Sequence, residues 1–106
     1  MAVIAITVLE LKPGRWDDAR GVIKTGNALI KKHGGENVTT MVGMLAGPAS
    51  GRVSTLWTAT DWQSFGEVFN ALMADPEVTA LMTDSMGPDG PTEGFDTYVN
   101  QTVPDL

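Results

Sequence analysis

The stretch from Arg52 to Met86 constrains the fold more than any other part of the chain; it reads RVSTLWTATDWQSFGEVFNALMADPEVTALMTDSM. Its first residues, Arg52 to Thr60, are rich in β-branched and aromatic side chains and contain no Gly or Pro, which predicts a strand. Thr60 and Gln63 then fit a capping box, and Asp61 is an equally good N-cap one residue later. A strand that passes directly into a helix is therefore expected here.

The helix after this cap has its apolar residues three and four positions apart, at Phe65, Val68, Phe69, Leu72 and Met73. This spacing places them on one stripe, which we expect to be buried. Asp75-Pro76 ends the helix and begins a second one, because Pro disfavours helical conformation in the residue before it and suits the first turn of a new helix. Gly87-Pro88 ends the second helix, whose apolar face continues through Val78, Leu81 and Met82.

The N-terminal part predicts a strand and a helix. Ala2 to Leu11 is a strand with apolar residues on both faces, so both faces need cover. Helical spacing of apolar residues then runs from Trp16 to Lys32 or His33, with Gly34-Gly35 as the C-cap. Gly26 costs about 1 kcal/mol inside a helix, which indicates a close approach to the sheet beneath it or to a ligand.

Two more strands complete the pattern. Val38 to Ala46 is predicted to be a strand, and residues 47–51 are too short for a crossover, so they form a hairpin that leads into Arg52. Gly87 to Pro91 is an irregular loop. Phe95 to Val103 is the last strand, and its half-polar alternation is typical of an edge strand or one that faces a wet cavity.

This order, βαββαβ, predicts an α+β ferredoxin-like fold with one antiparallel sheet and the helices on one of its faces. The length of 106 residues is that of a single domain, residues 1–106. Helices on one side leave the other apolar face of the first strand uncovered. A second copy of the chain is the simplest cover, so we expect a homodimer that packs sheet to sheet into an α/β barrel.

Charge and composition exclude several partners. The net charge of −6 argues against nucleic acid and anionic membranes as partners. All seven Lys and Arg lie at or before Arg52. The acidic remainder either lies beside the basic half or forms a surface for a cationic partner. Absence of cysteine and of a signal-like N-terminus favours a cytoplasmic protein, with no disulfide, thiolate metal site or membrane span.

The chain resembles the dimeric α/β-barrel superfamily, which includes antibiotic-biosynthesis monooxygenase-like and stress-responsive barrel proteins. The resemblance covers nearly the whole chain and rests on Lys12-Pro13-Gly14 before the first helix, on Leu56-Trp57 running through Thr60-Asp61 into the helix with Phe65, and on the Asp75-Pro76-Glu77 break. It implies a ferredoxin-like homodimer. It is specific for fold and leaves the function open, because one fold hosts many activities.

The haem-degrading branch of that superfamily is similar in plan and uses polar residues that this chain lacks. That branch keeps an Asn on the first strand, a Trp in the second main helix and a His at the end of that helix. Thr7 or its neighbour, Val68 or Phe69, and Leu81 or Met82 stand at these places. We therefore expect no haem, and no flavin or metal cofactor either.

Two side chains are candidates for proton transfer. His33 is the only histidine, and its unperturbed pKa suits acid-base work near neutrality. A His at a helix C-terminus is also favoured by the helix dipole, so a structural role is the preferred interpretation. Tyr98 is the only tyrosine, and in an apolar setting its hydroxyl needs a partner.

Five residues are candidates for lining a cavity between helices and sheet: Trp57, Phe69, Met73, Met82 and Tyr98. His33 is expected to close one end. The alternative is that these residues are ordinary core. Three functions are compatible with the sequence: a protein that binds a small apolar or aromatic molecule, a cofactor-independent monooxygenase or isomerase acting on an aromatic substrate, and a structural or interaction module.

Overall fold

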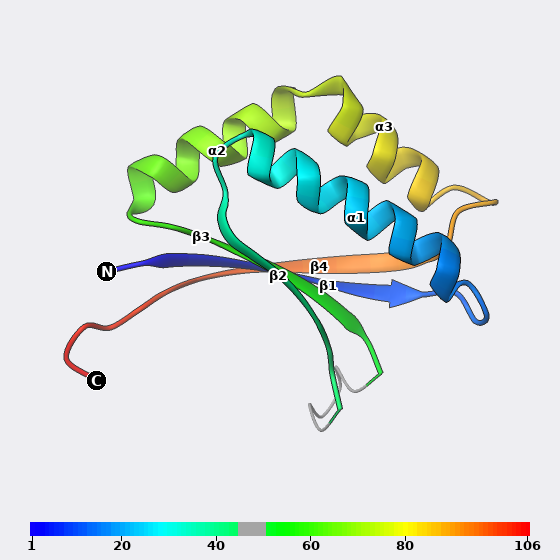
Figure 1. The fold of residues 1–106 in the computed structure, drawn as a ribbon, viewed down its shortest axis with the longest axis horizontal. Coiled ribbons are helices and arrows are strands. Elements are labelled where there is room, and N and C mark those ends of the chain that lie inside the picture. The colour runs from blue at the N-terminus through cyan, green and yellow to red at the C-terminus, as the bar shows by residue number, and fades with distance from the viewer. Residues whose placement is uncertain (45–50) are drawn as a thin grey trace.

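The computed structural model describes residues 1–44 and 51–106. Its elements follow in the order β1 (Val3–Leu11), α1 (Trp16–Lys32), β2 (Glu36–Val42), β3 (Val53–Ala59), α2 (Trp62–Ala74), α3 (Pro76–Ser85) and β4 (Thr92–Gln101). The strands form one antiparallel sheet in the order β2-β3-β1-β4, and the helices all lie on one side of it (Figure 1). The predicted α+β ferredoxin-like fold is confirmed.

The sheet register divides each strand into two faces. Val3, Ala5 and Thr7 of β1 lie on the side of the sheet that the helices cover, and the residues that alternate with them, Ile4, Ile6 and Val8, lie on the uncovered side. On that uncovered face Ile6 lies between Leu56 of β3 and Tyr98 of β4. As predicted, β1 has apolar side chains on both faces of the sheet. Only one of these faces is covered within the chain.

Two strands begin earlier than the sequence predicts. β2 begins at Glu36, because Glu36 pairs with Thr58 and the register then shifts before Thr39, with Asn37 at a φ of 51°. It ends at Val42, so Gly43 and Met44 of the predicted strand are not part of it, and the predicted strand and turn residues 45–50 lie outside the described residues. β4 extends from Thr92 to Gln101, because Thr92 still pairs with β1 beyond an irregularity.

Asp61, rather than Thr60, caps α2. The Asp61 Oδ1 atom accepts a hydrogen bond from the Ser64 amide at 2.8 Å. Hydrogen bonds from Ser64 lower the pKa of the Asp61 carboxyl. Gln63 donates its side-chain amide to Glu67 instead of reaching back to Thr60, so the alternative capping box does not form.

The core lies between α1, α2 and the central strands. It includes Ala5, Leu29, Trp57, Val68 and Leu72, with Phe65 packed against them. The expectation that the whole α2 stripe is buried is wrong for two of its members, because Phe69 is 41% and Met73 50% exposed. Both lie on the side of α2 that borders a cavity between the helices and the sheet.

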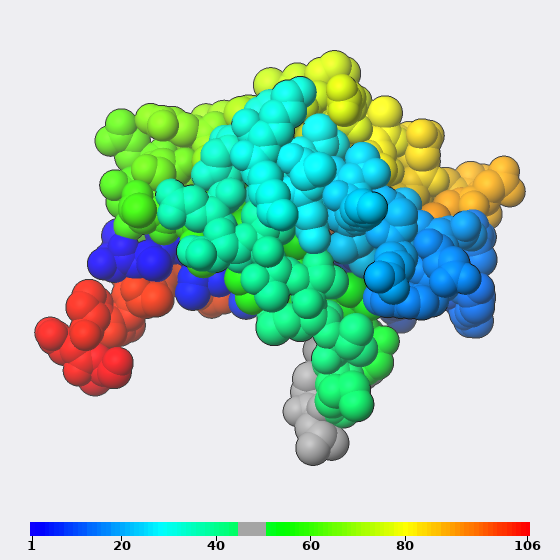
Figure 2. Space-filling view, viewed as in Figure 1, coloured from blue at the N-terminus to red at the C-terminus, as the bar shows by residue number. Residues whose placement is uncertain are grey.

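α1 and β2 lie side by side on the face of the molecule that Figure 2 shows, with α2 and α3 along its upper edge. Gly26 of α1 approaches α3 rather than the sheet, since a Cβ placed on it lies 3.6 Å from Leu81 Cδ2. In the ranges that the structure describes, no helix has both the length and the apolar character needed to cross a membrane.

Alanine substitution of helical glycines should stabilise the fold. At Gly66, inside α2, an added Cβ meets no atom within 4 Å. We expect Gly66→Ala to raise the free energy of unfolding by about 0.5–1 kcal/mol, measured by urea denaturation, because alanine loses less backbone entropy in a helix. Gly90→Ala is the opposing control, since its Cβ would overlap the backbone carbonyls of Asp84 and Ser85. Equal free energies of unfolding for Gly66→Ala and Gly90→Ala would contradict the packing described around these two glycines.

Candidate functional site

A cavity of about 520 Å³ lies between the three helices and the sheet. Its walls are mostly apolar side chains of α1, α2 and α3, and its floor is the helix-facing side of β1, β3 and β4. Four of the predicted lining residues are brought together here: Trp57, Phe69, Met73 and Met82. The cavity therefore lies between the elements from which the sequence predicts it.

Aromatic rings run from the core to the mouth of this cavity. The Phe65 ring stacks on Trp57 with centroids 5.2 Å apart and on Phe69 with centroids 5.8 Å apart. Trp57 is buried, whereas other lining residues are exposed, among them Phe69 and Met73 of α2, and Phe95 and Val99 of β4. The cavity therefore opens between α2 and β4, at the edge of the sheet that the helices cover least.

Tyr98 does not line the cavity, so its predicted place is corrected. It pairs with Ile6, and both side chains point to the uncovered face of the sheet. Its neighbours Thr97 and Val99 line the cavity instead. The physical reason is that successive side chains of a strand point to alternate faces of the sheet. Tyr98 therefore lies on the other face from Phe95, Thr97 and Val99. Tyr98 is 55% exposed.

His33 is not a lining residue either, and its expected position at one end of the cavity is wrong. Its Nε2 atom donates to Asp75 Oδ2 at 2.7 Å, while the amide of Glu77 donates to Asp75 Oδ1 at 2.9 Å. Asp75 therefore caps α3 with one oxygen and binds the C-terminus of α1 with the other. This arrangement gives His33 a structural role that joins two helices.

The electrostatics of this helix junction centre on the Asp75 carboxylate. The hydrogen bond from His33 lowers the pKa of Asp75, and the hydrogen bond from the Glu77 amide acts in the same direction. The Lys32 ammonium, 3.9 Å from Asp75 Oδ2, adds a weaker attraction. These groups hold Asp75 in its charged form at neutral pH.

A row of threonines that sequence reasoning missed crosses the sheet, and three of its members, Thr7, Thr55 and Thr97, lie in the floor of the cavity. Thr40 pairs with Thr55, Thr55 with Thr7, and Thr7 with Thr97, so one threonine of each strand lies in a single line across the sheet. The Thr40 and Thr55 hydroxyl oxygens are 3.2 Å apart, and those of Thr7 and Thr97 are 3.1 Å apart. The sequence contains only part of this signal: Thr7 and Thr55 each interrupt an otherwise apolar strand face, but the alignment of all four threonines depends on the strand registers.

The cavity offers polar groups but no charged ones. Among the described residues that line it, the polar members are Thr7, Asn27, Thr55, Ser85, Thr92 and Thr97, and none carries an ionisable side chain. Ser85 and Thr92 already bond each other through their hydroxyls at 2.6 Å. Nor do three His, Asp or Glu side chains gather at any point of residues 1–44 and 51–106 in a way that would hold a metal ion.

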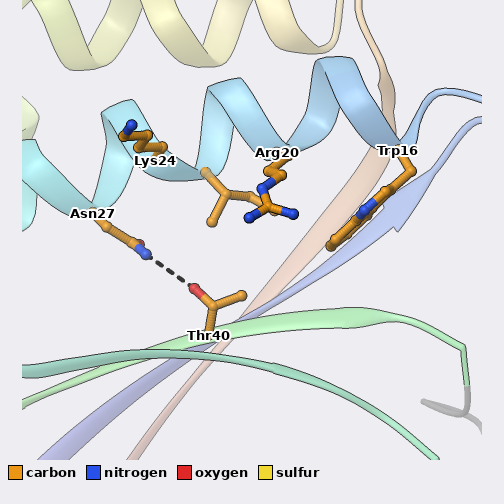
Figure 3. A pocket seen from close by; sticks show the side chains of 6 residues that line it. Trp16, Arg20, Lys24, Asn27 and Thr40 are labelled. Atoms are coloured by element: carbon orange, nitrogen blue, oxygen red, sulfur yellow. Dashed lines mark hydrogen bonds between the residues drawn. The ribbon is translucent and has the colours of Figure 1, made fainter.

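A second hollow, of about 420 Å³, lies between α1 and β2. Figure 3 shows Trp16 and Arg20 pointing from α1 toward the sheet, with Lys24 one turn further along the helix. Asn27 donates to Thr40 across this hollow at 2.9 Å. The two hollows adjoin, because Ile23 and Asn27 line both of them.

The Asp75 junction predicts a pH-dependent contribution to stability. Because the pKa of Asp75 is lowered by folding, its ionised form stabilises the fold above the unfolded value of about 3.9, and this contribution is lost as pH falls through the folded pKa. We expect Asp75→Asn, which keeps an oxygen for the Glu77 amide, to unfold at lower urea concentration than the wild type at about pH 7.

The difference between Asp75→Asn and the wild type should shrink as the pH is lowered toward about 2, because the wild-type carboxyl then becomes neutral. Asp105→Asn is a matched control, since no ion pair joins Asp105 to another described residue. A deficit of the Asp75 variant that is the same at every pH would contradict the electrostatic role.

Only solved structures match this chain in comparisons with known proteins. No protein-family model matches the chain, and no curated protein matches it significantly. A NIPSNAP family protein from Agrobacterium tumefaciens has a TM-score of 0.73 and 12% identity, over 96% of this chain and 86% of that chain. An uncharacterized NIPSNAP domain protein from Burkholderia xenovorans has a TM-score of 0.72 and 14% identity, over 95% and 94%.

A dabb family protein from Mesorhizobium loti, described as having a ferredoxin-like fold, has a TM-score of 0.66 and 12% identity, over 97% of this chain and 99% of that chain. These likenesses agree with the ferredoxin-like fold that the sequence predicts. At such identities they bear on the fold alone. The chain therefore has the ferredoxin-like fold that is also found in NIPSNAP and dabb family proteins.

Proposed function

We propose that this protein binds a small apolar or aromatic molecule in the cavity between the helices and the sheet. The cavity carries this proposal: its volume of about 520 Å³ is within the range of about 300–1,000 Å³ typical of small-molecule sites. Its lining is mostly apolar, and the stacked Phe65 and Phe69 rings lead from the mouth to Trp57. Transfer of an apolar ligand from water to this apolar surface lowers the free energy.

Binding is favoured over the alternative of a cofactor-independent monooxygenase or isomerase. Such an enzyme needs a group that moves a proton at the substrate. The two candidates for this work, His33 and Tyr98, point elsewhere, and the described lining residues have no other ionisable side chain. A purely structural module, the remaining alternative, gives no reason for the exposed Phe69, Met73 and Phe95 around one opening.

A neutral aromatic probe tests the proposal. We expect naphthalene at saturating concentration to raise the melting temperature, because a ligand that binds only the folded state stabilises it by about 2.7 kcal/mol at a concentration of 100 Kd. Leu81→Trp should weaken naphthalene binding by about tenfold, since Leu81 lines the cavity and a larger ring would fill it.

The matched control is Ala80→Trp, which adds the same ring to the exposed side of α3. Its naphthalene affinity should equal that of the wild type, measured by titration calorimetry on proteins with intact melting transitions. No thermal shift in the wild type, or the same affinity in Leu81→Trp and Ala80→Trp, would overturn binding in this cavity.

The protein is further proposed to act as a homodimer, with a second copy on the uncovered face of the sheet. This face carries Ile4, Ile6 and Val8 in its middle, flanked by Leu56 and Tyr98. The ends of β2 and β3 near their connection and the last residues of the chain project on this side (Figure 1). A two-fold axis through the face would let the apolar residues of each copy cover those of the other.

Light scattering measures this association directly. We expect the mass of a dimer at micromolar concentration, and a monomer for Ile6→Glu, because a carboxylate in the middle of an apolar interface is desolvated without a partner. Ala80→Glu, on the exposed helix surface, is the control and should stay dimeric. A monomer mass for the wild type under these conditions would rule out the proposed dimer.

A further inference from the structure

The threonine row lies between two apolar rows on the same floor. On one side of it Ala5 is in register with Trp57 and Val99, and on the other Leu9 is in register with Val53 and Phe95. Hydroxyl groups therefore cross the middle of an apolar surface. A ligand that covers this floor has apolar contact at both ends and hydroxyl groups at its centre.

The hydroxyl pairs have protons that their own bonds do not use. Each threonine hydroxyl carries one proton, so a bonded pair has two and uses only one between its members. Thr7 with Thr97 and Thr40 with Thr55 are two such pairs. No hydrogen bond joins Thr55 to Thr7 in the described part of the chain, so each pair keeps one proton for an outside acceptor.

Asn27 sets the direction of one of these pairs. Its Nδ2 atom donates to Thr40 Oγ1 at 2.9 Å, as Figure 3 shows, and Thr40 Oγ1 lies 3.2 Å from Thr55 Oγ1. A hydroxyl that accepts a hydrogen bond becomes a better donor, so the favoured order runs from Asn27 to Thr40 to Thr55. The spare proton then belongs to Thr55, which lines the cavity and is buried.

The same cavity disfavours a charged ligand. No ionisable side chain is present among its described lining residues, so an ammonium or carboxylate group would lose its hydration without a counter-charge. Arg20 and Lys24 line the adjoining hollow between α1 and β2 and do not line the cavity. Hydrogen-bond donors without charge match an oxygen that accepts but is not ionised.

We infer that the ligand is an uncharged molecule with a carbonyl oxygen in its middle and apolar groups on both sides, such as an internal ketone or an ester. The carbonyl accepts from Thr55 and from the Thr7 and Thr97 pair, and the apolar arms lie over the flanking rows. This inference rests on the proposed binding function and adds the chemical class of the ligand.

Three probes of equal carbon number test the inference: dipentyl ketone, undecane and undecanoate. We expect the wild type to bind dipentyl ketone about tenfold more tightly than undecane, because the ketone adds hydrogen bonds. Undecanoate, at a pH where it is ionised, should bind most weakly. Affinities are measured by competition against naphthalene, with the intact protein.

Thr55→Val replaces the hydroxyl by a methyl group of similar size. We expect it to weaken dipentyl ketone binding by about threefold, because one of the two hydrogen-bond donors to the carbonyl is lost, and to leave undecane binding unchanged. Thr58→Val is the matched control, with the same substitution on the same strand but on the uncovered face, opposite Ile4. Thr97→Val, on the exposed edge strand, gives a second variant if Thr55→Val does not fold.

The outcomes separate this inference from the proposed function. If dipentyl ketone binds the wild type no more tightly than undecane does, and Thr55→Val changes neither affinity, the hydroxyl row does not recognise the ligand. Apolar binding in the cavity would still stand. Tighter binding of undecanoate than of dipentyl ketone would also overturn the inference. It would instead indicate that Arg20 and Lys24 contact the ligand. If none of the probes, naphthalene included, binds the wild type, the proposed function fails as well.

Discussion

The register of β1 between β3 and β4 is the constraint on which the site depends. Because side chains alternate along a strand, this register places Ala5, Thr7 and Leu9 under the helices and Ile4, Ile6 and Val8 on the opposite face. The helices cover only the first set. One strand therefore supplies both the floor of the cavity and the middle of the surface proposed to meet a second copy, and a shift of one residue would exchange the two.

The sequence was sufficient for the fold because local signals agreed with one another. The β-branched residues before Thr60, the cap at Asp61 and the Asp75-Pro76 break each predict an element boundary, and the structure places β3, α2 and α3 within a residue or so of them. β2 and β4 were predicted less well at their ends. Their bounds depend on pairing with β3 and β1, including the irregularities at Asn37 and near Leu11, which no local pattern reveals.

The candidate site was predictable only in its apolar part. Trp57, Phe69, Met73 and Met82 lie on faces that helical and strand periods identify, and all four line the cavity. His33 and Tyr98 were chosen for their chemistry, but their environment depends on tertiary contacts: Asp75 is far from His33 in the sequence, and Tyr98 lies on the other face from its neighbours. The threonine row depends on the registers of all four strands, so only the assembled sheet reveals it.

The exposed mouth of the cavity has a kinetic consequence. Phe69 and Met73 border the opening on α2 and Phe95 borders it on β4, and all three already contact solvent. A guest would pass them by rotation of side chains, which takes picoseconds to nanoseconds at exposed positions, whereas separation of packed helices takes microseconds or longer. Exchange of a small apolar molecule should then be limited by its diffusion to the opening and by its release, without a slow conformational step before it enters.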